Sequence, residues 1–148
     1  MALERTLTII KPDAVAANNI GNILAIIETA GLRVIATKML HMSNEHTEKL
    51  YEEHKERPFY ASLAGYMASG PVLIMVLEGE NAVSSLRKIM GATIPKDAET
   101  STIRNLYAKH KQKNGVLENA IHGSDSGTSA QREIAFFFKP KDICLRTR

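Results

Sequence analysis

The chain has one cysteine, no long hydrophobic run and no glycine-rich phosphate loop. A lone cysteine, Cys144, cannot form an internal disulfide, so the sequence favours a reducing, cytoplasmic location. The longest apolar run, 71–77, is far shorter than the roughly 20 residues that cross a membrane, and residues 1–6 lack the features of a signal peptide. Neither GxxxxGKS/T nor GxGxxG occurs. The two common glycine cradles are therefore excluded, and side chains would have to bind any phosphate.

The remaining composition is that of an ordinary globular domain, with 44% hydrophobic and 24% charged residues among 148. This length suits one domain over residues 1–148. The 19 Lys and Arg residues nearly balance the 16 Asp and Glu residues, which gives a formal net charge of +3. So small an excess of positive charge does not indicate a surface specialised for binding polyanions, and it fits anionic small molecules as well as nucleic acid.

Alternating strand-like and helix-like patterns predict the fold. Four segments have the composition of strands: 6–10, 32–40, 71–78 and 134–138. Apolar residues at helical spacing predict helices over 20–30, 59–67 and 81–90, and a further helix follows Ser43, where only the cap half of a capping box is standard. This order is typical of an α+β, ferredoxin-like split βαβ fold, an antiparallel sheet with helices on one face. Because this fold hosts many functions, it indicates none by itself.

The segment 119–126, NAIHGSDS, is the most informative stretch of the chain. It places His122 before a glycine, which lets the backbone approach a ligand closely, and then before Ser124 and Asp125. Glu133 opens the last predicted strand, where burial would make an unpartnered carboxylate costly. An imidazole N–H would satisfy it and would leave the other ring nitrogen free to attack phosphorus. An inert histidine in a loop of Asx and Ser turns is the alternative, and the spacing alone leaves both open.

Cations for a phosphate are present but scattered along the chain. The candidates are Lys11, Arg57, Arg87 and Arg104. Each of them alone is more often a solvated surface charge, and the same reading applies to the four histidines other than His122. The histidines lack cysteine partners at the spacing of a zinc site, so the sequence does not predict zinc.

The segment 119–126 resembles the NxxHGSD signature of nucleoside diphosphate kinases. Further blocks resemble the same family, in order and over essentially the whole chain: 8–14, 57–60, 69–72, 90–93, 102–104 and 133–135. The resemblance implies one nucleoside diphosphate kinase-like domain that moves the terminal phosphate of a nucleoside triphosphate to a nucleoside diphosphate. It also implies a ping-pong route through a phosphohistidine, Mg²⁺ on the nucleotide and acceptance of many bases.

The resemblance assigns the catalytic roles to particular residues. His122 would carry the phosphate on Nδ1, while Glu133 would hold the other ring nitrogen and Ser124 would bond to Glu133. Lys11 would contact the γ-phosphate and the ribose 3′ hydroxyl, and Tyr51 would lie beside the histidine and the phosphate in transfer.

The resemblance also implies a nucleotide-binding set: Lys11 and Asn119 on the sugar, Phe59 stacked on the base, and Arg87, Thr93 and Arg104 on the phosphates. Asp125 would hold a water molecule bound to magnesium. Three features depart from the family's pattern, namely Ile94 after Thr93, Ser101 where glycine is common, and a link over 105–118 that is longer than usual. The long link affects subunit contacts and base-edge contacts and leaves the catalytic blocks intact.

The expected partners are nucleoside di- and triphosphates and further copies of the chain. The family forms tetramers or hexamers, and the short basic tail over 139–148 favours the tetramer. RNA binding as a main role is disfavoured because the strands at 6–10, 32–40 and 71–77 offer no aromatic stacking platform, so nucleic acid is expected only as a side activity. An inactive relative acting as a scaffold is disfavoured by the presence of His122 and its matched partners.

Overall fold

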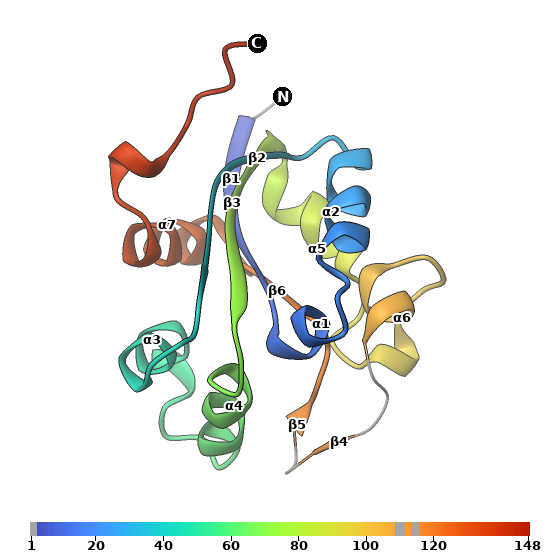
Figure 1. Cartoon of the computed structure of the whole chain (residues 1–148), viewed down its shortest axis with the longest axis vertical. Coiled ribbons are helices and arrows are strands. Elements are labelled where there is room, and N and C mark those ends of the chain that lie inside the picture. The colour runs from blue at the N-terminus through green and yellow to red at the C-terminus, as the bar shows by residue number, and fades with distance from the viewer. Residues whose placement is uncertain (1–2, 109–111, 114–115) are drawn as a thin grey trace.

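A four-stranded antiparallel sheet forms the centre of the structure, a computed structural model that describes residues 3–108, 112–113 and 116–148 (Figure 1). Its strands are β1 (Leu3–Ile10), β2 (Arg33–Leu40), β3 (Val72–Glu80) and β6 (Ile121–Gly123). They lie in the order β2-β3-β1-β6, and all neighbouring pairs are antiparallel. The predicted α+β, ferredoxin-like fold is confirmed.

Helices cover both faces of this sheet. They are α1 (Pro12–Ala16), α2 (Ile20–Thr29), α3 (Asn44–Leu50), α4 (Tyr60–Met67), α5 (Ala82–Met90), α6 (Ile103–Tyr107) and α7 (Gly127–Phe137). Short 3-10 turns and a small hairpin complete the elements: η1 (Glu52–His54), η2 (Pro95–Asp97), β4 (Gln112–Lys113), β5 (Val116–Leu117) and η3 (Pro140–Asp142). None of the helices in the described ranges combines the length and apolarity needed to cross a bilayer.

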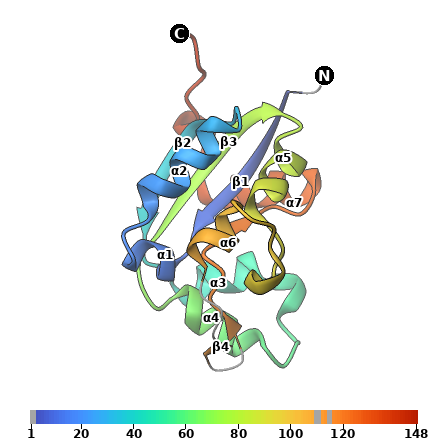
Figure 2. The same cartoon turned by 90° about the vertical axis from the view of Figure 1, so that its right-hand side faces the viewer.

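The two helices of the ferredoxin-like motif, α2 and α5, share one face of the sheet, as expected from the sequence (Figures 1 and 2). Helices α3, α4 and α7 form a second layer on the opposite face, which the sequence pattern did not predict. Residues along β3 alternate between the two cores, with Ile74 in one and Met75 in the other. Because helices lie against both faces of the described sheet, bases have no open face on which to stack, which further disfavours the RNA-binding reading.

The predicted strand over 134–138 is wrong, because residues 134–137 form the end of helix α7 and Phe138 follows it directly. Ser126 begins this helix by accepting a hydrogen bond from the backbone N–H of Ser129, at 3.1 Å. The buried positions Ala130, Glu133 and Phe137 then recur every three or four residues and face the sheet. A short apolar run satisfies a strand or a buried helix equally well, and the fourth strand is instead β6.

The other predicted elements are confirmed in kind, with small shifts at their ends. The helix after Ser43 has both halves of its capping box, because His46 Nδ1 accepts a hydrogen bond from the Ser43 backbone N–H at 3.0 Å. Helix α1, directly after β1, was not predicted. Within the long link over 105–118, the described residues form part of α6 and the β4–β5 hairpin, while 109–111 and 114–115 lie outside the described residues.

Candidate active site

A single cavity of about 320 Å³ brings together almost all of the predicted site residues. Those that line it are Lys11, Tyr51, Phe59, Arg87, Thr93, Arg104, Asn119, His122, Asp125 and Glu133. Ser124 does not line it, because this fully buried side chain lies behind Glu133. Strand β6 pairs with β1 in the register Ile9↔His122, which brings the end of β1 beside the histidine.

The imidazole of His122 is oriented by a buried carboxylate. Its Nε2 lies 2.9 Å from Oε1 of Glu133, which is 6% exposed on the inner face of α7. Ser124 donates its hydroxyl to the same Oε1 at 2.8 Å. Because a carboxylate only accepts, Nε2 carries the proton and Nδ1 keeps its lone pair. The contacts expected from the sequence are present, although a helix rather than a strand supplies the carboxylate.

Arg132 and Glu53 extend this network along the wall of the cavity. Arg132 Nη2 lies 3.8 Å from the second carboxylate oxygen of Glu133, and its Nη1 donates to Oε1 of Glu53 at 2.8 Å. Both residues line the cavity, and neither was predicted from the sequence to have a role there. The only signal for Arg132 in the sequence was its position directly before Glu133.

Lys11 occupies the point where β1 ends and α1 begins. Its Nζ donates to Oδ1 of Asn119 at 2.8 Å, and the residue is 7% exposed. Burial, and then the positive charge of Arg104, lowers the pKa of Lys11, Asp13 acts in the opposite direction, and the net result is a pKa of about 7. An anionic ligand beside Lys11 would favour the charged ammonium form.

Arg104 and Asn119 brace the backbone around the cavity. The Arg104 guanidinium donates to the carbonyl oxygens of Asn119, Gly91 and Ile121 at 3.2, 3.1 and 2.8 Å. Burial, and then the charge of Arg87, lowers the pKa of Arg104 to about 10. The Asn119 amide donates to the Thr93 carbonyl at 3.1 Å. These two predicted ligand-binding side chains thus also hold three backbone segments together.

Glycine at position 123 allows close packing of a helix, in addition to the close approach of a ligand that was predicted from the sequence. A Cβ at this position would lie 2.5 Å from Met90 Sδ and 2.9 Å from Leu86 Cδ2, so the missing side chain makes room for helix α5. The Gly123 carbonyl accepts from Arg87 Nη1 at 3.2 Å. Close packing of α5 therefore places Arg87, which is exposed, at the mouth of the cavity beside His122.

Phe59 presents an aromatic surface at the cavity, with 42% of the residue exposed. Leu63, one helical turn later, also lines the cavity, and the spacing of four residues could have identified it in the sequence. The ring of His54 lies 5.9 Å from that of Phe59. Tyr51 also lines the cavity; it is buried and its hydroxyl has no hydrogen-bond partner among the described residues, while burial and the charge of Glu133 raise its pKa.

Asp125 supplies an exposed carboxylate at the rim of the cavity. A hydrogen bond from Ser129 lowers its pKa, and the positive charge of Arg87 acts in the same direction. An exposed carboxylate oxygen is a suitable partner for Mg²⁺ or its water shell, so the residue fits the predicted role.

Comparison with known proteins gives one consistent result. The nucleoside diphosphate kinase family model matches residues 4–143. A curated nucleoside diphosphate kinase from Nitrosococcus oceani is 54% identical over 146 residues, which cover 99% of each chain.

Solved structures agree with this match. A transition-state mimic of the enzyme from Borrelia burgdorferi, with bound vanadate and ADP, has a TM-score of 0.92 at 33% identity and covers 99% of this chain and 93% of that one. A halophilic nucleoside diphosphate kinase from Halobacterium salinarum in complex with CDP has a TM-score of 0.90 at 38% identity, covering 99% and 95%.

Proposed function

The chain belongs to the nucleoside diphosphate kinase family and moves the terminal phosphate of a nucleoside triphosphate to a nucleoside diphosphate, and we propose that His122 carries the phosphate between the two. The observation that supports this role is the His122–Glu133 contact, which leaves Nδ1 with a free lone pair in a cavity lined by four cationic side chains. A neutral, oriented imidazole is a competent nucleophile toward phosphorus.

The reaction consists of two transfers at the same nitrogen. In the first, Nδ1 of His122 forms a bond to the γ-phosphorus while the bond from that phosphorus to the bridging oxygen breaks, and a nucleoside diphosphate leaves. Glu133 stabilises the positive charge that the ring gains. In the second, a terminal oxygen of the incoming diphosphate attacks the phosphorus and the N–P bond breaks. Because donor and acceptor bind in turn, one nucleotide cavity is sufficient.

Phosphoryl transfer depends mainly on positioning and charge neutralisation, which the cavity residues supply. We assign Lys11, Arg87 and Arg104 to the phosphate oxygens, with the Thr93 hydroxyl as a further donor. The Tyr51 hydroxyl, buried beside the cavity, is assigned to the phosphate in transfer. Ser124 acts through Glu133, whose Oε1 it holds on the imidazole side.

The base is assigned to the exposed part of the cavity and the sugar to its buried part. Phe59 and Leu63 provide an apolar platform, and stacking on a ring reads no base edge, so purines and pyrimidines should both be accepted. The two related structures described above hold ADP and CDP. Asn119 and Lys11 serve the sugar, and their mutual hydrogen bond sets their spacing.

Magnesium is assigned to Asp125 indirectly, through a water molecule of the ion's shell. When bound to the nucleotide phosphates, the ion supplies further neutralisation of negative charge. The Asp125 carboxylate stands at the rim of the cavity, on the same side as Arg87, whose positive charge acts to lower its pKa.

We further propose that residues 1–148 form one domain, that the enzyme works in the cytoplasm and that it assembles as a homotetramer rather than a hexamer. The single cysteine, Cys144, is exposed and forms no disulfide, which supports a reducing compartment. Multi-angle light scattering of the purified protein distinguishes four copies from six.

The experiment that tests this function is transfer of label from γ-labelled ATP. With Mg²⁺, the protein should gain an acid-labile phosphate and pass it to GDP and CDP. His122→Ala should abolish labelling, whereas His41→Ala, at an exposed histidine outside the cavity, should not. Labelling of folded His122→Ala protein would show that the nucleophile is another residue, and labelling without transfer to any diphosphate would contradict the ping-pong route.

A further inference from the structure

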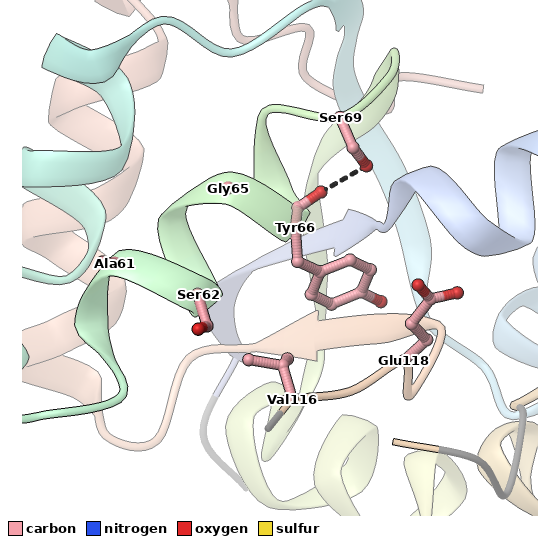
Figure 3. A pocket seen from close by; sticks show the side chains of 7 residues that line it. All are labelled: Ala61, Ser62, Gly65, Tyr66, Ser69, Val116 and Glu118. Carbon is pink, nitrogen blue, oxygen red and sulfur yellow. Dashed lines mark hydrogen bonds between the residues drawn. The ribbon is translucent and has the colours of Figure 1, made fainter. Parts of the chain in front are cut away.

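Tyr66 and Asp13 form a buried pair beside Lys11, outside the cavity that contains His122. Tyr66, on α4, is 8% exposed and Asp13, on α1, is 9% exposed. The Tyr66 hydroxyl donates to Oδ1 of Asp13. Neither side chain lines the His122 cavity; Tyr66 instead lines a separate cavity of about 490 Å³, in which its ring projects toward Glu118 (Figure 3). Lys11, which lines the His122 cavity and lies over the Tyr66 ring, links the pair to that cavity.

The ammonium group of Lys11 is held between two neighbours. Its Nζ lies 5.6 Å from the centre of the Tyr66 ring, within the range of a cation–π contact. The same atom donates to Oδ1 of Asn119 at 2.8 Å. A long, flexible lysine side chain is thereby restricted to one direction, which lowers the entropy it would lose on binding a phosphate.

The ring itself is fixed at its backbone and at its hydroxyl. The Tyr66 carbonyl accepts from the Ser69 hydroxyl at 2.6 Å, which secures the end of α4 (Figure 3). The Tyr66 hydroxyl is bound to Asp13, which lies only two residues beyond Lys11 in the chain. The hydrogen bond therefore ties helix α4 to the segment that carries the lysine.

We propose that Tyr66 and Asp13 are positioning residues for the phosphate-transfer reaction. The Tyr66 ring holds the Lys11 ammonium group at the cavity, and the Asp13 carboxylate supplies the negative charge that keeps this group protonated. This inference rests on the role proposed above for Lys11 as a phosphate ligand.

The charged groups around Lys11 explain why such support matters. Burial and the neighbouring Arg104, on α6, lower the pKa of Lys11, and Asp13, on α1, raises it. Together they give a pKa of about 7. Tyr66 and Asn119 face the ammonium with an aromatic ring and an amide oxygen, neither of which carries a charge. Without Asp13, the charged form of Lys11 would be lost at a lower pH.

The test compares the pH dependence of kcat/KM for His122 phosphorylation by Mg-ATP in four variants. Asp13→Asn keeps the shape and can still accept from Tyr66, so it should fall about twofold below the parent enzyme at pH 6 and about tenfold below it at pH 8, in proportion to the charged fraction of Lys11. Tyr66→Phe keeps the ring, and Tyr66→Leu removes it, so the second should raise the KM for ATP more than the first. Tyr60→Phe, at the start of the same helix, is the matched control and should change neither quantity.

Two results would overturn the inference. One is a parental pH profile in folded Asp13→Asn together with a parental KM in Tyr66→Phe and Tyr66→Leu. The other is an equal loss for Asp13→Asn at every pH, which would indicate a structural role only. If Tyr66→Leu does not fold, Asp13→Asn decides. Lys11→Met separates this inference from the proposed function: a full rate in that variant would remove Lys11 from the mechanism, whereas a large loss beside an unchanged Asp13→Asn profile would remove only the positioning role.

Discussion

Replacing Glu133 with glutamine removes the charge behind the proposed nucleophile and keeps the shape of the side chain. In the parent enzyme, Oε1 accepts from His122 Nε2 at 2.9 Å and from Ser124 at 2.8 Å, in a site that is almost fully buried. A hydrogen bond to a charged group contributes about 1.5–3 kcal/mol, against about 0.5–1.5 kcal/mol for a neutral one. The difference, about 1–1.5 kcal/mol, predicts that phosphorylation of His122 slows roughly tenfold.

The glutamine variant should change the rate much more than nucleotide binding, because the lost charge faces the imidazole. Rapid-quench measurement of label on the protein gives the transfer rate, and equilibrium dialysis of ADP gives the affinity. Ser124 adds a sharper test: its hydroxyl keeps the oxygen of the new amide on the imidazole side. Ser124→Ala combined with Glu133→Gln lets the amide turn its NH2 toward Nε2, which would move the ring proton to Nδ1 and block attack.

The combined variant should therefore lose more activity than the product of the two single losses. A rate for Glu133→Gln within twofold of the parent would show that the carboxylate charge does not assist transfer. A strictly multiplicative double variant would show that Ser124 does not set the orientation of the side chain at 133. Circular dichroism of each variant confirms that the comparison is made between folded proteins.

Three further predictions concern charge and backbone geometry. Binding of the ADP phosphates should restore the charge of Lys11, whose pKa is about 7. The enzyme should therefore take up as much as about 0.9 proton per bound ADP at pH 8 and far less at pH 6. Calorimetry in buffers of different ionisation enthalpy measures this uptake. Ser101 is exposed and has a φ of +72°, so Ser101→Gly should stabilise the fold by about 1 kcal/mol, seen as a rise in Tm of roughly 2–4 °C. Gly123→Ala would place a Cβ 2.5 Å from Met90 Sδ and should destabilise the fold by about 1–3 kcal/mol in urea unfolding.

Each of these predictions has a matched control. Equal proton uptake by the parent and by Lys11→Met would assign the effect to another group. Ala25→Gly, at an exposed position inside α2, should lose about 1 kcal/mol, and the same loss at 101 would contradict the strain argument. A Gly123→Ala protein as stable as the parent would show that α5 can move away from β6.

The departure from the family pattern at Ser101 affects the backbone conformation of the chain. The position where the family commonly has glycine has a left-handed backbone here, which glycine adopts without steric cost and serine does not. The second departure, Ile94, places a large apolar side chain 42% exposed at the surface beside Thr93. Nothing in the structure explains that choice.

The sequence by itself determined which chemical groups the site contains and the order of most elements. Its apolar periodicity located β1, β2, β3 and the helices α2 and α5, because these segments carry their pattern locally. The segment 119–126 identified the histidine and, through the resemblance, the family.

Only the tertiary structure decided which groups meet and in what state. The run 134–137 is helical because burial every three or four residues against the sheet outweighs its local ambiguity, and the carboxylate of Glu133 therefore reaches His122 from a helix. Arg104 donates to three carbonyls, and the Lys11 pKa falls to about 7, because segments far apart in the chain enclose both side chains. Burial and neighbouring charge depend on the whole fold, so no local pattern can specify them.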